Sequence, residues 1–212
     1  MSKPRCQVSI DLETLGTSPD SVILSIGAVA VCTETGQIVK FYGACAVDSQ
    51  QHRTISKSTL NWWENQSANA REALDFAKSD DCPSLQDTLS RLTGWLGDLG
   101  KTHDVYVWGN GSEFDIGLLN HAYKQISDFV PWNFRNSRDM RTLYDVTLRF
   151  GLDIKGNAKR VGTHHHALDD AEFQSSVIME SLRQIDLVAE FIRGEAREQF
   201  QDFLARSKET AV

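Results

Sequence analysis

The sequence predicts an α/β fold in which a mixed five-stranded sheet, three antiparallel strands followed by two parallel ones, is flanked by helices. Two observations carry this prediction. The region up to residue 47 consists of three short segments rich in valine and isoleucine, separated by turn residues. Beyond residue 54 the apolar spacing becomes helical and is interrupted by two further strand-like segments. Strands first, then an alternation of strands and helices, indicate a mixed sheet with helices on its faces.

The three N-terminal strands are expected at residues 7–13, 22–32 and 38–47. The stretches GTSPD and TETGQ separate them, and both are rich in turn-forming residues. Such short connections favour an antiparallel meander.

The later elements follow from apolar spacing and turn signals. The first helical pattern after residue 54 is carried by Leu60, Trp63, Leu85, Leu89, Leu92 and Leu96. We expect a strand at 105–108, a helix that begins near Phe114, a strand at 134–139, and helices at 140–150, 167–185 and 187–206.

At 212 residues the chain suits one domain with a substantial core, and we expect residues 1–206 to form it, with residues 207–212 as a frayed tail. The four cysteines include no C-x-x-C pair, so we interpret them as reduced thiols. The N-terminus lacks an apolar signal segment, and the most apolar run, residues 22–32, is too short to span a bilayer. We therefore expect a cytoplasmic protein without a membrane partner.

The net charge of −7 argues against a protein that coats nucleic acid electrostatically. Residues 133–160 have the opposite bias. Their basic residues are Arg135, Arg138, Arg141, Arg149, Lys155, Lys159 and Arg160, against the acids Asp139, Asp145 and Asp153. This region is either a solvated basic face or a guide for a nucleic-acid strand.

The stretch SIDLETLG places two carboxylates, Asp11 and Glu13, in an otherwise strand-like segment. Side chains alternate faces along a strand, so both carboxylates project the same way, with Cα atoms roughly 6.5–7 Å apart. Such a pair repels unless cations neutralise it. Mg²⁺ prefers hard oxygen ligands and suits the position. The alternative is an edge-strand pair that faces water.

Asp115 is expected in the first turn of the helix that follows the strand at 105–108. A carboxylate there can simply complement the helix dipole. The same helical face, however, continues through Leu118 or Leu119, Ala122 and Ile126. Asp115 is therefore expected to face the core, just beyond the end of a strand, where α/β proteins form sites.

The third candidate is the stretch GTHHHALDDAEF, in which Asp169 and Asp170 occupy the first turn of a helix. Three adjacent histidines do not easily converge on one zinc ion, and no cysteine pattern supports such a site. A loop histidine is better suited to proton transfer if a metal-bound water lies within reach.

The order and spacing of these residues resemble the DEDDh class of 3'-5' exonucleases, which share a ribonuclease-H-like fold. In that pattern Asp11 and Glu13 match the first motif, Asp115 the second and Asp170 the last acid. Only His165 precedes both the Ala-Leu dipeptide and Asp170 at the family's spacing, which leaves Asp169 as a variable neighbour. The stretches SPDSVILSIGAVAV, LNWWENQSANAREAL and SRDMRTL are similar to the phage and bacterial subgroup that includes exoribonuclease A and exonuclease VIII-like proteins.

The resemblance implies a metal-dependent 3'-5' exonuclease that releases 5'-mononucleotides from single-stranded or 3'-overhanging RNA or DNA. Two divalent cations, Mg²⁺ or Mn²⁺, would be held by Asp11, Glu13, Asp115 and Asp170, with His165 as general base. The residues that follow the first motif, Thr14 and Leu15, would hold the terminal nucleotide. Several relatives dimerise, so the resemblance allows a homodimer, but the sequence does not give the oligomeric state.

Adjacent tryptophans on a helix face about 100° apart, so one of the pair at 62–63 is expected in the core and the other at the surface. We expect Trp63 to pack with Leu60, and Trp62 is the candidate for stacking on a base.

Two rival functions stay open. The chain could be a nucleic-acid-binding or complex-forming subunit with vestigial nuclease activity, although no acid of the catalytic set is missing. It could also hydrolyse very short oligonucleotides. The sequence does not predict whether the substrate is RNA or DNA, because it does not show which residues would contact a 2'-hydroxyl group.

Overall fold

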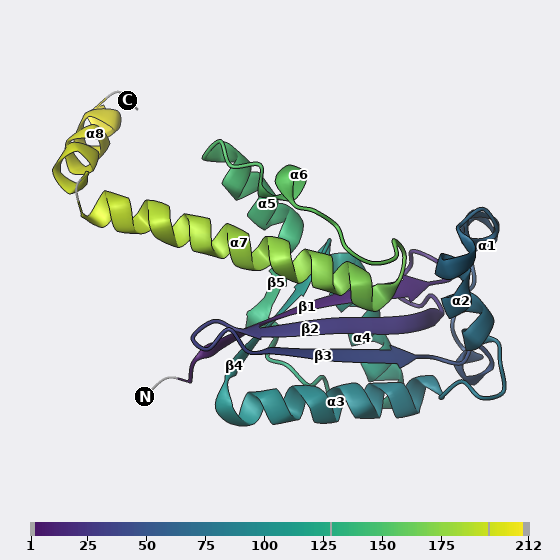
Figure 1. The fold of residues 1–212 in the computed structure, drawn as a ribbon. Helices are drawn as coiled ribbons and strands as arrows, with labels where there is room; N and C mark the ends of the chain where they lie inside the picture. The colour runs from purple at the N-terminus through teal and green to yellow at the C-terminus, as the bar shows by residue number, and fades with distance from the viewer. Residues whose placement is uncertain (1–2, 128, 195, 210–212) are drawn as a thin grey trace.

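A computed structural model describes residues 3–127, 129–194 and 196–209 (Figure 1). Its five strands form one sheet in the order β3-β2-β1-β4-β5. Their bounds are Arg5–Thr14 (β1), Ile23–Cys32 (β2), Ile38–Ala44 (β3), Asp104–Gly109 (β4) and Ser137–Asp139 (β5). β1 to β3 pair antiparallel, whereas β4 pairs parallel to β1 and β5 parallel to β4. The predicted mixed sheet is therefore confirmed.

Helices cover both faces of the sheet (Figure 1). They are α1 (Lys57–Glu64), α2 (Ala68–Ala77), α3 (Leu85–Thr102), α4 (Ser112–Ile126), α5 (Met140–Arg149), α6 (Ile154–Asn157), α7 (Ala167–Arg193) and α8 (Arg197–Glu209), with short 3-10 turns at Asp48–Gln50 and Phe134–Asn136. α7 crosses one face, and α3 and α4 pack on the other. The end of α7 and all of α8 extend beyond the sheet (Figure 1).

The two faces of β1 have different chemistry. Val8 and Ile10 are fully buried in the main core with leucines of α3 and apolar residues of α4. Ser9 points to the opposite face, where its hydroxyl donates to Gln174 Oε1 of α7 at 3.1 Å. The period of two along the strand thus separates an apolar face from a polar one, as the sequence predicts.

The prediction of two helices at 167–185 and 187–206 is wrong in its boundary. α7 continues without a break from Ala167 to Arg193. No glycine or proline lies between the start of the helix and Gly194, so nothing interrupts the backbone hydrogen bonds at the expected boundary. Gly194 caps the helix and α8 follows.

The strand expected at 134–139 is shorter than predicted. Asn133 accepts the backbone N–H of Arg135 through its side-chain oxygen, at 3.0 Å, and this bond starts a 3-10 turn. Only Ser137–Asp139 pair with β4. At the C-terminus, α8 includes residues 207–209 of the expected tail, and residues 210–212 lie outside the described part of the chain.

All four cysteines are free and buried, as predicted from their spacing. Within the described residues, no helix is both long enough and apolar enough to span a membrane.

Candidate active site

β1 delivers two carboxylates to the polar face of the sheet. Asp11 Oδ1 accepts a hydrogen bond from Gln174 Nε2 at 2.6 Å, so this carboxylate faces α7. Glu13 lies two residues on and is only 6% exposed. The register of β1 against β2 shifts between Glu13 and Thr14. Irregularities of this kind are common beside active sites, where they change the direction of a side chain. The two acids therefore share one buried face and do not form a water-facing edge pair.

Asp115 reaches the same region from the first turn of α4 and is 2% exposed. Its Oδ2 accepts the backbone N–H of Asn110 at 3.0 Å. A Cβ placed on Gly109, the last residue of β4, would lie 3.1 Å from this carboxylate. Asp115 is thus buried just beyond the end of a strand, as predicted. Ile126, expected on the same apolar stripe, is 41% exposed at the end of the helix.

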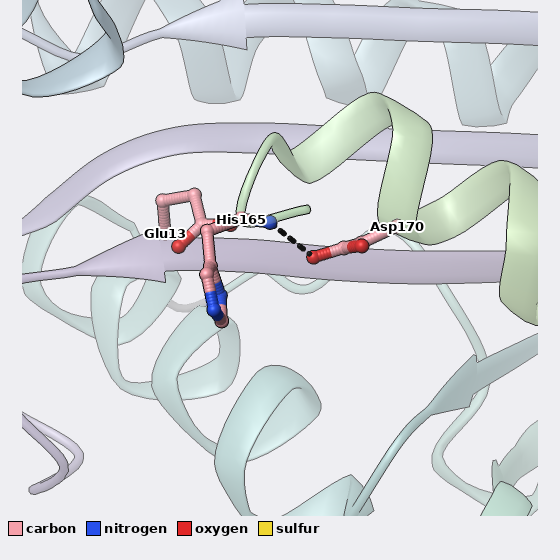
Figure 2. A group of neighbouring side chains, drawn as sticks. All are labelled: Glu13, His165 and Asp170. Atoms are coloured by element: carbon pink, nitrogen blue, oxygen red, sulfur yellow. Dashed lines mark hydrogen bonds between the residues drawn. The ribbon is translucent and has the colours of Figure 1, made fainter. Parts of the chain in front are cut away.

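His165 and Asp170 come from the loop before α7 and from its first turn. Ligand atoms of Glu13, His165 and Asp170 all lie within 4.8 Å of one another (Figure 2). The His165 backbone N–H donates to Asp170 Oδ2 at 3.1 Å. Among the described residues other than glycine, His165 has the one positive φ, 64°. This uncommon backbone conformation lets the turn bring the imidazole beside the carboxylates.

The other two histidines of the triplet have different neighbours. His166 caps the N-terminus of α7 and stacks on Tyr42 of β3, with ring centroids 5.0 Å apart. His164 meets the ring of His165 edge-on, at 3.9 Å. Of the three histidines, His165 is the one that joins the group of possible metal ligands found among the described residues, together with Glu13 and Asp170.

Asp169 connects the histidine loop to the start of α7. Its Oδ2 accepts the backbone N–H of Thr163 at 2.6 Å. A Cβ on Gly162, whose φ is +92°, would lie 2.6 Å from the Asp169 carboxyl carbon. The histidine loop is therefore fastened to the first turn of α7 through Asp169.

Asp11, Glu13 and Asp115 repel one another when they are ionised. Burial raises the pKa of Asp11 well above its ordinary value, and the charges of Asp115 and Glu13 raise it further. Burial and then the Asp115 charge raise the pKa of Glu13 to about 8. Burial raises the pKa of Asp115 to about 7, although the Asn110 N–H favours its ionised form. The site concentrates negative charge that protein groups do not fully offset.

Two residues that the sequence analysis did not single out contact these acids. Gln174 bridges Ser9 and Asp11, and it lies four residues after Asp170, on the same face of α7. Arg160 forms an ion pair with Asp170, and its guanidinium lies over the ring of Phe173 at 4.3 Å. The helical spacing of Gln174 was the available signal for the first residue, whereas nothing in the sequence indicated the pairing of Arg160.

Gly27 of β2 permits the close approach of α7 to the sheet. It pairs with Asp11 across the antiparallel ladder. A Cβ at this position would lie 2.2 Å from the backbone carbon and oxygen of Ala167 and 2.4 Å from the nitrogen of Leu168. Because no side chain intervenes, the first turn of α7 packs directly on the strand.

A pocket of about 470 Å³ opens onto these residues. Its lining includes Asp11, Glu13, Thr14, Trp62, Phe114, His165 and Asp170. Trp62 is 40% exposed, and its ring meets that of His165 edge-on at 4.7 Å. Trp63 is fully buried in a core cluster against which Leu60 packs, as predicted.

The structure does not bring the Leu15 side chain to this pocket. Leu15 is 1% exposed and packs in the cluster that contains Trp63. Its backbone N–H donates to Val22 and its carbonyl accepts from Ser56, each at 2.8 Å. Leu15 follows the register shift in β1 and its side chain turns into the core, so a substrate contact of its backbone stays a prediction.

A family model and two curated proteins match the chain. A family model described as the 3'-5' exoribonuclease Rv2179c-like domain matches residues 6–182, which include every candidate acid and His165. The exodeoxyribonuclease of Enterobacteria phage T4 is 25% identical over 166 residues, which are 66% of this chain and 70% of that protein. DNA polymerase III PolC-type of Bacillus subtilis (strain 168) is 24% identical over 193 residues, 83% of this chain.

Solved structures share the fold at lower identity. The nuclease domain of 3'hExo, a DEDDh family member, bound to rAMP, aligns with a TM-score of 0.57 and 18% identity over 85% of this chain and 93% of that one. Cell-death related nuclease 4 (CRN-4) aligns with a TM-score of 0.63 and 13% identity over 86% of this chain. The chain spans 65% of the CRN-4 structure and 11% of the polymerase.

Proposed function

We infer how this chain acts from the premise that it belongs to the Rv2179c-like family of 3'-5' exoribonuclease domains and is a 3'-5' exonuclease. The specific proposal is that it removes 5'-mononucleotides from the 3' end of a single-stranded or overhanging nucleic acid in a reaction that needs divalent cations. The observation that supports it most is the meeting of Glu13, His165 and Asp170, from separate elements, at the mouth of one pocket (Figure 2).

The residues present fit hard divalent cations such as Mg²⁺ or Mn²⁺. Asp11, Glu13 and Asp115 are carboxylates whose raised pKa values reflect uncompensated burial, and Asp170 completes the set. Carboxylate oxygens are the preferred ligands of these ions. Two cations at this position would activate water and neutralise charge on the phosphate.

The protein groups then have distinct roles. The four carboxylates bind the cations, with Gln174 fixing the orientation of Asp11 through its hydrogen bond. The imidazole of His165 lies beside Glu13 and Asp170 and can accept the proton of an attacking water. Its position depends on the backbone bond to Asp170 and on the turn with positive φ.

The pocket next to the acids would hold the terminal nucleotide. Its volume of about 470 Å³ lies in the range of small-ligand sites. Trp62 presents a partly exposed ring on which a base can stack without sequence preference. Thr14 lines the same pocket, although its hydroxyl already donates to Gly16. The 3'hExo structure holds rAMP, a mononucleotide of the kind proposed here.

The direct test is a nuclease assay with a 5'-labelled oligonucleotide and Mg²⁺ or Mn²⁺. A ladder that shortens from the 3' end, disappears with EDTA and is lost in Asp115→Asn is expected. Asp87→Asn is the matched control, because Asp87 also occupies the first turn of a helix, α3, but is exposed. A ladder that survives Asp115→Asn would refute the metal-site proposal. Binding of the strand without cleavage would indicate a vestigial nuclease.

Substrate class is tested separately with matched RNA and DNA strands of increasing length. Turnover of strands longer than a few nucleotides is expected. Activity confined to dinucleotides would favour the rival role in hydrolysis of very short oligonucleotides.

A further inference from the structure

A second hollow, of about 900 Å³, adjoins the active-site pocket. Thr17 and Phe114 line both, so the two hollows adjoin at these residues, and the second one is called the groove below. The rest of this groove is formed by the start of α4 and the start of α5, including Gly111, Ser112, Arg141 and Thr142. The groove therefore lies next to the active-site pocket at Phe114 and extends to Arg141.

Arg141 differs from most other basic residues of the segment 133–160. Five of the seven have a partner: Arg135 lies over the ring of Phe134, Arg138 donates to two backbone carbonyls, Arg149 pairs with Asp145, Lys155 lies over Tyr144 and Arg160 pairs with Asp170. Arg141 is exposed, and its guanidinium makes no hydrogen bond or ion pair with the part of the chain that the structure describes. Lys159 shares that property but lines a separate hollow with Asp153 and Glu180.

The position of Arg141 is fixed relative to the candidate metal site. A Cβ on Gly111 would lie 3.0 Å from Arg141 Cζ, so the guanidinium packs against the backbone just before α4. The helix that begins there, α4, carries Asp115 in its first turn. Two acids, Glu113 and Asp139, line the same groove. Asp139 accepts the N–H groups of Ser112 and Thr142, and neither acid forms an ion pair with Arg141 among the described residues. The guanidinium is thus left without a carboxylate partner.

We propose that Arg141 binds a backbone phosphate of the substrate, the one on the 5' side of the nucleotide that precedes the scissile bond. This inference rests on the proposed function. With the terminal nucleotide in the active-site pocket and the scissile phosphate at the acids, the rest of the strand leaves through the groove past Phe114. Arginine matches phosphate geometry with two parallel N–H donors. Arg141 is then the residue of the basic segment 133–160 that contacts the substrate strand.

The proposal predicts different KM values for two dinucleotides that differ only in a 5'-phosphate. A dinucleotide with a free 5'-hydroxyl carries only the scissile phosphate and does not reach Arg141. The same dinucleotide with a 5'-phosphate does. The wild-type protein should therefore show a lower KM for the 5'-phosphorylated form. Arg141→Gln should raise that KM by about tenfold and leave turnover of the unphosphorylated form within about twofold.

A binding measurement without metal gives a readout independent of chemistry. Fluorescence anisotropy of a labelled hexanucleotide in EDTA, repeated over a range of salt concentrations, should show weaker binding by Arg141→Gln and a salt slope smaller by about one. Arg141→Lys should bind with intermediate affinity, because it keeps the charge but loses the paired donors. Lys159→Gln removes the same charge from the other hollow and should behave as wild type.

Three outcomes would overturn the inference. Equal loss on both dinucleotides would mean that Arg141 acts on the metal site through Asp115. Equal losses of hexanucleotide affinity in Arg141→Gln and Lys159→Gln would mean that Arg141 contributes only nonspecific positive charge. A wild-type protein that cleaves no oligonucleotide with Mg²⁺ or Mn²⁺ would refute the proposed function itself, and this result is distinct from the other two.

Discussion

Replacement of Gly27 by alanine tests whether the approach of α7 to the sheet builds the site. Gly27 has no positive φ, so alanine fits the backbone and only the steric effect remains. The added Cβ would lie 2.2 Å from Ala167 backbone atoms, whereas ordinary contacts begin near 3.4 Å. The start of α7 must therefore move by about 1 Å or more, because backbone atoms cannot rotate away. His165 and Asp170 move with it.

The expected cost in the free energy of unfolding is about 1–3 kcal/mol, typical of overpacking in a filled interior. Activity should fall by about 100-fold or more, because a displacement of about 1 Å at a catalytic group has effects of that size. Urea unfolding measures the first quantity, and the 5'-labelled oligonucleotide assay measures the second.

Gly97→Ala is the matched control. Gly97 lies exposed in α3, and a Cβ there would have nothing within 4 Å. Alanine should stabilise this helix by about 0.5–1 kcal/mol and leave activity unchanged. The two substitutions thus have opposite signs. Wild-type activity and stability in Gly27→Ala would refute the reasoning, since α7 would then have room that the structure does not show.

Two further pairs of variants test the pocket and the support of Asp11. Trp62→Ala should keep the stability of the protein but weaken strand binding by about 1–3 kcal/mol in an anisotropy assay, whereas Trp63→Ala should cost about 3–5 kcal/mol of unfolding free energy; the reverse pattern would contradict the assignment of the two rings. Gln174→Ala removes the bonds to Ser9 and Asp11, each worth about 0.5–1.5 kcal/mol, and should weaken Mn²⁺ binding in calorimetry several-fold. Gln184→Ala, on the same helix but bonded to the surface residue Glu180, should not, and equal effects would show that Gln174 has no special role.

Much of the site could be predicted because its signals are local. The alternation of β1 places Asp11 and Glu13 on one face whatever the rest of the fold does. The position of Asp115 in a first helical turn that also faces the core follows from the spacing of Leu118 and Leu119. The burial of Trp63 and the exposure of Trp62 follow from helical geometry together with the position of Leu60.

What could not be predicted depends on contacts between distant segments. The role of Gly27 becomes visible only once the pairing of β2 with β1 places it opposite Asp11. Arg160 meets Asp170 because the loop between them folds back on α7. Leu15 follows a register shift in β1 that no residue type in the sequence predicts. The family resemblance suggested Leu15 as a substrate contact, whereas its side chain is buried in the core.

The free energy of unfolding with and without Mn²⁺ tests most directly whether the carboxylates form a cation site. Asp11, Glu13 and Asp115 repel one another when ionised, so in EDTA at a pH above about 8 Asp11→Asn should raise the free energy of unfolding by about 1–3 kcal/mol. Saturating Mn²⁺ should stabilise the wild type by mass action and the variant much less, which reverses their order. A variant that is less stable than wild type in EDTA, and that gains as much from Mn²⁺, would show that these carboxylates do not form a cation site.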